Sequence, residues 1–403
     1  MNAKDSSQTN LQQLDTTGAK ILRGELKSCS RCIYDETIPA IHFDEEGVCN
    51  YCRMIEQLEE EYKTGTPEGE QTFFEIVEKI KKAGKNKKYD CVIGVSGGTD
   101  SSYMVHKAVE WGLRPLAVHY DNTWNTAIAT ENIRKVLGKL NIDLYTHVVD
   151  NKEADDIFRS FFRANVPDLD CPTDIALAEV LYRAANKYGV KYILEGHSFK
   201  TEGVSPLSNS YIDGQYVKTV QKLYGSHKIK TFPNMDFNAF MKWTIFKRIR
   251  KIRPLWYIKY SKEEARAMLE KEYGWEYYGG HHLENRMTAI HHSFYNPRKF
   301  QVDQRNNSLS AAVRLGIKTR QEALEEYAKY PTIEPELVDY FKKRLNIPEE
   351  EFNAIMNGDK KSYKDYKTYK KRFEKLRPLF YILAQSSLVP KSFYIKYCSK
   401  SEI

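Results

Sequence analysis

The fold of this chain is decided by residues 91–102, which read CVIGVSGGTDSS. The first five residues form a short apolar run that is typical of a buried strand, and a helix-like stretch follows as far as Trp111. Gly97 and Gly98 allow the backbone to turn sharply and to approach an anion without a clash from Cβ. Such a turn presents backbone N–H groups at a helix N-terminus, where phosphate binds readily. The segment therefore predicts a strand, a phosphate-binding loop and a helix.

The side chains of this loop add to the predicted phosphate site. Serine hydroxyl groups can donate hydrogen bonds to phosphate oxygens, and Asp100 can hold Mg²⁺ on the phosphates or cap the helix. The loop differs from the GxxxxGK[ST] motif because it has no lysine at the required position. The nucleotide-binding residues predicted here are Ser96, Gly97, Gly98, Thr99, Asp100, Ser101 and Ser102.

Outside this loop, apolar runs alternate with helical segments. Strands are predicted at 91–95, 116–118, 144–149 and 192–194, with helices at 126–140 and 174–188. Apolar strands that alternate with helices are typical of a parallel sheet covered on both faces. We therefore predict an α/β fold with a doubly wound parallel sheet, in which ligands bind beyond the carboxyl ends of the strands.

Two cysteine pairs precede the sheet. Cys29 and Cys32 form one CxxC motif, and Cys49 and Cys52 form a second. Each spacing can place two thiolates on one tetrahedral ion, so the four cysteines predict a closed structural Zn²⁺ site. An iron–sulfur cluster or free thiols are the weaker alternatives.

A polar segment follows the fourth predicted strand. His197 could act as a general base, contact phosphate or serve only as a structural hydrogen-bonding group, and Glu195 is a second candidate base. Cys171 lies before Pro172 and Asp174, a pattern that reads either as part of the site or simply as a helix start.

A dense polar block covers residues 279–320. Guanidinium groups bind phosphate or carboxylate in a bidentate manner, so Arg286, Arg305 and Arg314 predict a substrate anion site. The adjacent histidines, His281 with His282 and His291 with His292, do not predict a metal, because neighbouring side chains rarely reach one ion. A solvated surface is the alternative.

The phosphate loop resembles the SGGxDS signature of the ATP pyrophosphatase, or PP-loop, superfamily, which includes asparagine, GMP and NAD synthetases and several tRNA-modifying enzymes. The resemblance implies cleavage of ATP between the α and β phosphates. It also implies that the adenosine lies against the segment after the second strand, at Val118, His119, Asp121 and Asn122, and that Gly196 borders the nucleotide.

Further blocks resemble a narrower family, the N-acetyl sugar amidotransferases of surface-polysaccharide (LPS O-antigen) biosynthesis. They are the two CxxC pairs, the loop, DNTWN (121–125), CPTD (171–174), EGHSFKTEG (195–203), GHHLENR (280–286) and FQVDQR (300–305). The similarity covers about residues 25–330. It implies substrate-binding roles for Asp174, Lys200, Glu202, His281, His282, Glu284, Asn285, Arg286, Asp303, Arg305 and Arg314.

The regions expected from these features are a disordered tail (1–24), a four-cysteine zinc module (25–66), a PP-loop ATP-binding domain (67–225), a substrate-binding extension (226–330) and a helical basic C-terminal region (331–403).

The family resemblance implies a reaction and its partners. ATP would adenylate the acetamido oxygen of a sugar or sugar nucleotide, and ammonia would convert the imidate to an acetamidino group. Position 2 is Asn, and no cysteine lies in a GxCxG-type elbow, so the chain lacks a recognisable glutaminase nucleophile. We expect a separate glutaminase, with an ammonia-channelling cyclase-like subunit, to supply ammonia.

Two other function classes remain open. A tRNA thiolase or related RNA-modifying enzyme would also combine this loop with cysteine knuckles, but thiolation usually needs a reactive cysteine pair near the site. A nucleotide-binding zinc scaffold is the third possibility. The net charge of +8 permits an anionic partner without selecting one, and nucleic acid is the less favoured partner.

We expect the protein to be cytoplasmic. The first 20 residues are polar and lack the apolar segment of a signal peptide. The apolar stretch 378–389 is too short to span a bilayer and is interrupted by polar residues. We therefore expect no integral membrane segment.

Overall fold

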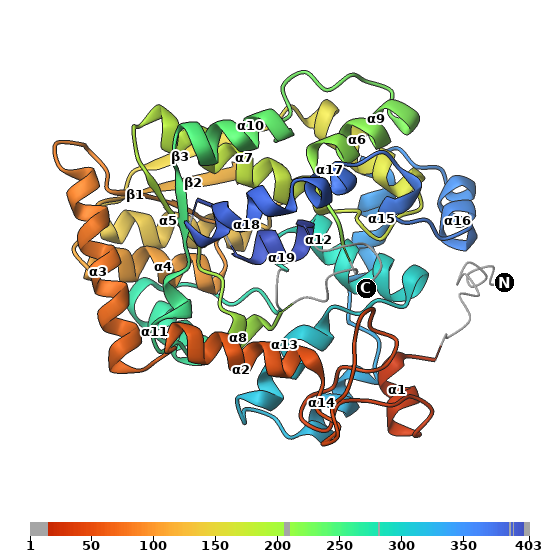
Figure 1. Ribbon diagram of the computed structural model, residues 1–403. Helices are drawn as coiled ribbons and strands as arrows, with labels where there is room; N and C mark the ends of the chain where they lie inside the picture. Colours follow the sequence, from red (N-terminus) through yellow and green to blue (C-terminus); the bar gives the residue numbers. More distant parts are fainter. Residues whose placement is uncertain (1–14, 205–209, 281–282, 387, 390, 399–403) are drawn as a thin grey trace.

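A computed structural model gives the structure of the protein, and it describes residues 15–204, 210–280, 283–386, 388–389 and 391–398. Its centre is a parallel sheet of five strands in the order β3-β2-β1-β4-β5 (Figure 1). The strands are β1 (Cys91–Gly94), β2 (Pro115–Asp121), β3 (Leu144–Val148), β4 (Tyr192–Leu194) and β5 (Arg250–Ile252). The strand order changes direction on either side of β1, and such a switch point is where open α/β sheets bind ligands.

Helices cover both faces of this sheet. On β1, Cys91 and Ile93 point into a core shared with α3, α4 and α5, whereas Val92 belongs to the core on the other side, with α6 and α7. Figure 1 shows α4 and α7 on opposite sides of the strands. The predicted doubly wound parallel sheet is therefore confirmed. The helices of this part are α3 (Pro67–Gly84), α4 (Thr99–Glu110), α5 (Ala127–Leu140), α6 (Asn151–Arg163), α7 (Cys171–Lys187), α8 (Phe199–Glu202), α9 (Gly214–Tyr224), α10 (Phe237–Met241) and α11 (Lys262–Tyr273).

The edge strand β5 was not predicted. It pairs with β4 through Arg250, Lys251 and Ile252, and two of these three residues are charged. A three-residue strand at a sheet edge needs no apolar run, because one of its sides faces no further strand. The hydrophobic pattern therefore gives no signal for it.

The N-terminal residues also differ from the prediction. Helix α1 (Thr17–Leu22) begins at the N-cap Thr16, and Ile21 is buried with Leu324 and Tyr327. The prediction of a disordered tail is therefore wrong for residues 17–22. The reason is a tertiary contact with a helix about three hundred residues further along, which no local pattern reveals.

The other regular elements of the described chain are helical. Around the cysteine pairs and after the sheet these are α2 (Asn50–Tyr62), α12 (Arg286–Ile290), α13 (Arg305–Arg314), α14 (Arg320–Tyr327), α15 (Pro335–Arg344), α16 (Glu349–Asn357), α17 (Lys370–Lys375), α18 (Arg377–Gln385) and α19 (Lys391–Cys398), with π-helical turns at Lys242–Phe246 and His291–Phe300 and 3₁₀ turns at Pro254–Trp256 and Tyr363–Asp365. The last three helices share an aromatic core with α10, formed by Phe237, Phe240, Phe373, Phe380 and Phe393. This core brings the end of the chain back over α7.

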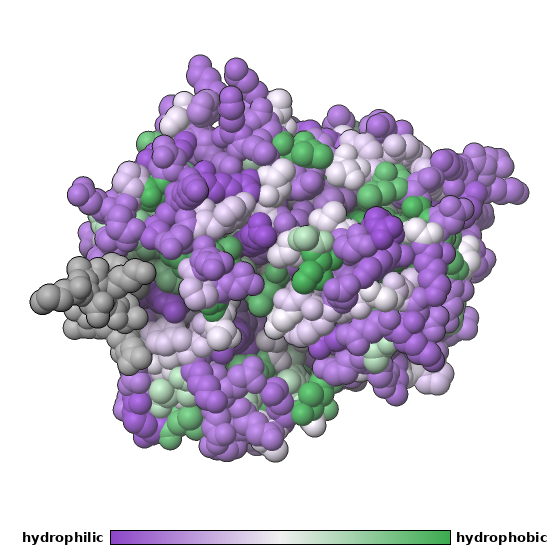
Figure 2. Space-filling view, turned by 180° about the vertical axis from the view of Figure 1, so that it is seen from behind, coloured by the Kyte–Doolittle hydropathy of each residue, from purple (hydrophilic) through white to green (hydrophobic). Residues whose placement is uncertain are grey.

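The outer surface is largely hydrophilic. On the face seen in Figure 2, apolar residues occur in small separate groups rather than one extended patch. Among the described residues, no helix combines the length and the apolar character that a bilayer crossing requires.

Two carboxylates of α6 hold the basic segment that follows α9. Glu153 accepts hydrogen bonds from the backbone N–H groups of Lys230, Thr231 and Phe232. One turn later, Asp156 accepts bonds from the N–H groups of Ser226 and His227, both at 2.9 Å. Burial alone would raise the pKa of Asp156, but Arg159 and these donors outweigh it and lower the pKa below 3.8.

We predict that Asp156→Asn lowers the free energy of unfolding by about 1–3 kcal/mol, because buried N–H donors lose a charged acceptor. The folded pKa is depressed, so this stabilisation is present at neutral pH and is lost as pH falls below the ordinary value of 3.8. Urea denaturation at neutral pH measures the difference. Glu75→Gln, at an exposed position of α3, is the matched control. Equal stability of the two variants would contradict this role of Asp156.

Candidate active site

The phosphate loop has a fixed shape in this structure. Gly97 has a φ of +83°, and a Cβ at this residue would lie 2.2 Å from the carbonyl oxygen of Ala129. The Gly97 carbonyl oxygen accepts a hydrogen bond from Trp275 Nε1 at 3.0 Å. The left-handed backbone and the contact with α5 thus both require glycine here.

The serines of the loop bond to the loop itself. Ser96 Oγ accepts from the backbone N–H of Gly98 at 3.2 Å, and Ser101 Oγ donates to the Gly98 carbonyl oxygen at 3.2 Å. Thr99 and Ser102 are buried. Gly98 is the N-cap of α4 and offers no side-chain cap. The first turn of α4 therefore begins as a phosphate-binding helix N-terminus does.

Asp100, in this first turn, is held by two residues that sequence reasoning missed. Lys262 Nζ lies 2.8 Å from its carboxylate, and the Tyr260 hydroxyl donates to the other oxygen. Burial opposes ionisation of Asp100, but the charge of Lys262 outweighs it, so the pKa of Asp100 is lowered. Asp100 is therefore an anion at neutral pH, as a Mg²⁺ ligand must be. Lys262 lies about 160 residues away in sequence, and no motif marks it.

A chain of polar groups links Asp100 to the end of β4. Lys262 Nζ also lies 3.8 Å from a Glu202 oxygen, and Glu202 lies 3.6 Å from His197 Nε2. On its other side, His197 Nδ1 accepts a hydrogen bond from Trp256 Nε1 at 3.2 Å. The donor Trp256 thus leaves the proton of a neutral His197 on Nε2.

The loops after β1 and β4 touch directly. A Cβ added to Gly196 would lie 2.8 Å from the carbonyl oxygen of Asp100. Gly196 therefore allows the EGHS segment to reach the phosphate loop, and the two predicted segments are brought together.

Glu195 forms ion pairs with two basic residues, one on β5 and one directly after it. Its carboxylate lies 2.6 Å from Lys251 Nζ and 3.1 Å from Arg253 Nε. Burial raises the pKa of Glu195, but these two cations more than offset it and lower the pKa to about 2. A carboxylate with so low a pKa is a weak base near neutral pH, so the geometry favours His197 over Glu195 as the proton acceptor.

The segment after β2 is joined to the block that begins at Glu284. Asn285 Nδ2 donates to Asn122 Oδ1 at 2.8 Å, and Asn125 forms a β-bridge with Asn285. Asp121 accepts from the backbone N–H of Thr123 at 2.7 Å. Two blocks that are about 160 residues apart in sequence thus form one wall beside the loop.

His119 and Val118 lie inside the sheet. His119 is buried, with Nδ1 2.8 Å from the Val95 carbonyl oxygen and Nε2 3.2 Å from Asn125 Nδ2. These contacts give His119 a positioning role at the edge of the expected adenosine site, and Val118 is part of the core.

The three arginines predicted to form one anion site have separate partners. Arg305 pairs with Asp303 at 2.6 Å and also donates to backbone carbonyls near α14. Arg314 lies 3.8 Å from Cys52 Sγ, whereas the Arg286 guanidinium stacks on Tyr340, 5.3 Å from the ring centroid. The three guanidinium groups thus have different neighbours, and a shared anion site stays a prediction.

The remaining predicted substrate residues are also dispersed. Lys200 pairs with Glu59 of α2 at 2.8 Å. Glu284 is buried, with Oε1 3.2 Å from the position a Gly98 Cβ would take. Asp174 lies in the first turn of α7 and lines a cavity. His281 and His282 lie outside the described residues.

The four cysteines form one cluster. All four thiols are buried, and their sulfur atoms lie within 4.8 Å of one another, with Cys29 and Cys52 at 4.0 Å and Cys32 and Cys49 at 3.8 Å. Tetrahedral coordination with Zn–S bonds of about 2.3 Å gives sulfur separations of about 3.8 Å, so the cluster fits a metal.

The cysteine module supports the loop that follows β4. The Tyr34 hydroxyl donates to the Val204 carbonyl oxygen at 3.1 Å, and Phe199 packs with Ile55 and Trp256. A metal at the cluster would thus stabilise the segment that carries His197 and Glu202.

Part of the chain matches a known protein family. Residues 284–377 match the family described as LPS biosynthesis protein WbpG-like, C-terminal domain. The resemblance to proteins of surface-polysaccharide biosynthesis is therefore confirmed for this segment. No curated protein sequence matches the chain.

Solved structures with a similar trace belong to two synthetases and a tRNA thiolase. NMN synthetase from Francisella tularensis has 13% identity and a TM-score of 0.30, covering 70% of this chain and 95% of its own. NH3-dependent NAD synthetase from Campylobacter jejuni has 15% identity and a TM-score of 0.30, with coverage of 66% and 98%. The U34-tRNA thiolase NcsA from Methanococcus maripaludis has 14% identity and a TM-score of 0.33, with coverage of 83% and 92%. The α/β fold is defined by the five-stranded parallel sheet and not by these TM-scores.

We predict that Gly196→Ala weakens ATP binding at least tenfold, because the new methyl group would push the β4 loop away from Asp100. Gly138→Ala is the matched control, since no atom lies within 4 Å of its Cβ position. Calorimetric titration with a non-hydrolysable ATP analogue measures both affinities. Unchanged affinity in Gly196→Ala would show that this contact is not needed.

We predict that the purified protein holds one Zn²⁺ per chain and that Cys49→Ser loses it, because a closed site needs four ligands. Elemental analysis by mass spectrometry measures the metal. Cys91→Ala, in the strand β1, should retain it. Iron with sulfide in place of zinc would contradict the assignment.

Proposed function

We propose that this protein is an ATP-dependent amidotransferase that converts the acetamido group of a sugar or sugar nucleotide into an acetamidino group. The observation that supports the proposal is the direct contact between the phosphate loop and the EGHS loop, which would bring His197 close to a nucleotide bound at the phosphate loop. The match of residues 284–377 to an LPS biosynthesis family supports a sugar as the substrate.

The first step activates the amide. The acetamido oxygen attacks the α-phosphate of ATP, the bond between the α-phosphate and the bridging oxygen breaks, and pyrophosphate leaves with the electron pair. The N–H groups at the start of α4 and the Lys262 ammonium stabilise the departing charge. Asp100 would hold Mg²⁺ on the phosphates. The nitrogen of the acetamido group releases its proton to solvent as the C=N bond forms, and the product is a neutral imidate whose oxygen carries AMP.

The second step forms the new C–N bond. Ammonia attacks the imidate carbon, the C–O bond breaks and AMP leaves. Ammonia brings one proton too many for the neutral amidine, and a base must accept it. We assign this role to His197. Its basic nitrogen is Nδ1, which accepts a hydrogen bond from Trp256 in this structure and would have to exchange that bond for the proton of the attacking ammonia. Glu202, beside Nε2, would stabilise the imidazolium that forms.

Ammonia would come from a separate glutaminase with a channelling subunit, and the reaction would take place in the cytoplasm. The zinc site would be structural, since all four ligand positions are cysteines and leave none for a substrate.

An RNA-thiolating function is the second candidate, and the chemistry near the site opposes it. Cys171 is buried, and burial raises its thiol pKa well above 9.0. It donates to Asp168 Oδ1 at 3.7 Å. A thiol with a raised pKa is a poor nucleophile, whereas thiolation needs a reactive one. A zinc scaffold without activity is the third candidate, and it gives no reason for an ionised Asp100 in the loop.

The proposal predicts that the protein, ATP, Mg²⁺ and ammonium chloride convert an N-acetylated nucleotide sugar to a product in which NH replaces one oxygen. AMP and pyrophosphate should form in equal amounts with the product, and glutamine alone should not replace ammonium. Mass spectrometry across a panel of such sugars measures this. AMP release that requires tRNA would support the thiolase, and no ATP turnover under any condition would support the scaffold.

We predict that His197→Asn lowers kcat of this reaction by about 10²–10⁴-fold, because the general base is lost. The exposed His42 provides the control variant His42→Asn, which should keep full activity. Steady-state kinetics at saturating ammonium measure the effect. An unchanged kcat in His197→Asn would remove this residue from proton transfer.

A further inference from the structure

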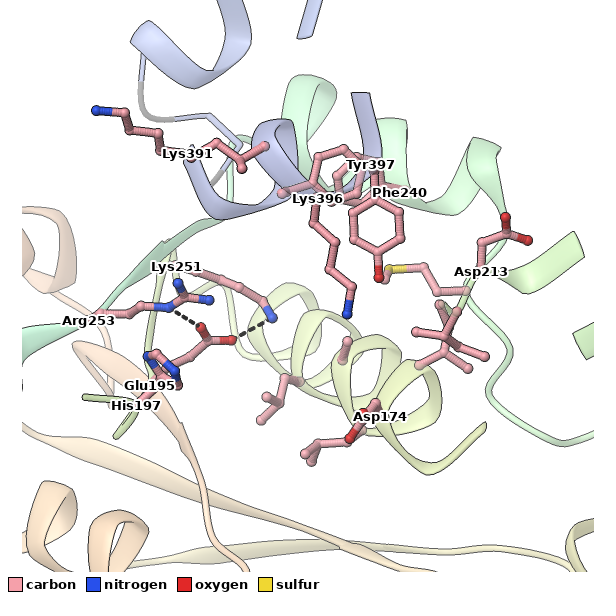
Figure 3. Close-up of a pocket in the computed structure, with 18 of the residues that line it drawn as sticks. Asp174, Glu195, His197, Asp213, Phe240, Lys251, Arg253, Lys391, Lys396 and Tyr397 are labelled. Carbon is pink, nitrogen blue, oxygen red and sulfur yellow. Dashed lines mark hydrogen bonds and ion pairs between the residues drawn. The ribbon is translucent and has the colours of Figure 1, made fainter. Parts of the chain in front are cut away.

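A cavity lies on the side of β4 away from the phosphate loop. It has a volume of about 610 Å³. Its walls come from the ends of β4 and β5, from α7 and from the C-terminal helix α19, which closes it from above (Figure 3). Cavities of this size hold small molecules up to the size of a sugar nucleotide.

One end of this cavity is lined by the proposed base His197 and by residues near it. Glu195 and His197 line it from the carboxyl end of β4, and Lys251 and Arg253 line it from β5 and the residue after it. His197 is also connected through Glu202 and Lys262 to Asp100. A molecule in the cavity can thus present one group to the nucleotide across β4.

The other end holds a cation without a close partner. Lys396 reaches down from α19 into the space between Glu195 and Asp213, toward the helix that carries Asp174 (Figure 3). Within the part of the chain that the structure describes, Lys396 Nζ has no hydrogen bond or ion pair, and its recorded aromatic contact is Tyr397 at 5.8 Å.

The carboxylate of the neighbouring Asp213 already accepts three hydrogen bonds. Its carboxylate accepts from the Tyr211 hydroxyl at 2.5 Å and from the backbone N–H groups of Tyr216 and Tyr369 at 2.7 and 2.6 Å. Asp213 therefore links the segments that carry these tyrosines at the cavity wall. The N–H donors of Lys396 stay available to a ligand.

Aromatic rings and balanced charges complete the lining. Phe237, Phe240, Trp256 and Tyr397 supply ring surfaces. The acidic side chains Asp174, Glu195, Asp213 and Asp236 are matched by Lys251, Arg253, Lys391 and Lys396. An RNA site would carry a clear excess of positive charge in an open groove. A lining with balanced charges, aromatic rings and single polar groups suits a neutral, hydroxyl-bearing ring.

We propose that this cavity is the acceptor site and that it holds the sugar ring, with the acetamido group toward His197 and a ring hydroxyl bound by Lys396. This inference rests on the proposed function for the identity of the ligand. The C-terminal helix α19 then becomes part of the site, although the family match ends at residue 377, before this helix begins. The ammonium of Lys396 donates to the hydroxyl oxygen of the sugar.

Lys396→Met tests the contact, since methionine keeps an unbranched apolar side chain and removes the charge. We expect KM for the sugar to rise about tenfold, the loss that follows when a charged hydrogen bond is removed, with KM for ATP unchanged. Lys375→Met, at an exposed position of α17, is the control and should leave both values as in the parent protein. An unchanged sugar KM in Lys396→Met would overturn the inference.

A binding experiment separates this inference from the proposed reaction. The probes are UDP-N-acetylglucosamine, N-acetylglucosamine and UDP, titrated calorimetrically into the full chain in the presence of a non-hydrolysable ATP analogue. Ala178→Phe fills the cavity from α7, and retained binding of the ATP analogue shows that this variant is folded. We expect Ala178→Phe and Lys396→Met to weaken binding of the N-acetylated probes.

The outcomes are distinct. Loss of sugar binding in both variants without any amidine product supports the cavity and refutes the reaction. Amidine formation with unchanged sugar affinity in both variants refutes the cavity and leaves the reaction intact. Binding of UDP alone, unaffected by the variants, or no binding of any N-acetylated probe to the parent protein overturns the inference.

Discussion

The site depends on the backbone contact between Gly196 and Asp100. Parallel strands β1 and β4 are neighbours, so the loops that follow them emerge at the same edge of the sheet. Only a residue without a side chain lets these loops touch, because a Cβ on Gly196 would lie 2.8 Å from the Asp100 carbonyl oxygen. The contact sets the distance between the N–H groups at the start of α4 and His197. Charge then reinforces it, since Lys262 lies between the carboxylates of Asp100 and Glu202.

The parts of the chain outside the sheet support this junction. The cysteine module and α2 pack against Phe199 and Trp256, which flank His197. The C-terminal helices share an aromatic core with α10 and place α19 over the end of β4. A fold with only the sheet and its helices would leave the loop after β4 without support on either side. This arrangement explains how remote segments can control the position of a single histidine.

Sequence reasoning found what local patterns encode. The strand–loop–helix unit, the alternation of strands and helices and the four clustered cysteines all follow from spacing and hydrophobicity, and the structure contains them. It missed Lys262 and Tyr260, because an isolated lysine after a short edge strand carries no motif. Its grouping of Arg286, Arg305 and Arg314 into one anion site stays a prediction, and proximity in sequence does not reveal which acidic groups and rings each guanidinium meets in the fold. The helix α1 was overlooked for the same reason, as only its contact with α14 orders it.

The central claim is that the acetamido oxygen is activated by transfer to the α-phosphate of ATP. The most direct test uses an N-acetylated nucleotide sugar with ¹⁸O in its acetamido group, incubated with the protein, ATP, Mg²⁺ and ammonium chloride. The account predicts that the label is recovered in AMP and is absent from both pyrophosphate and the amidine. AMP without the label, or label that remains in the sugar while ATP is consumed, would contradict it.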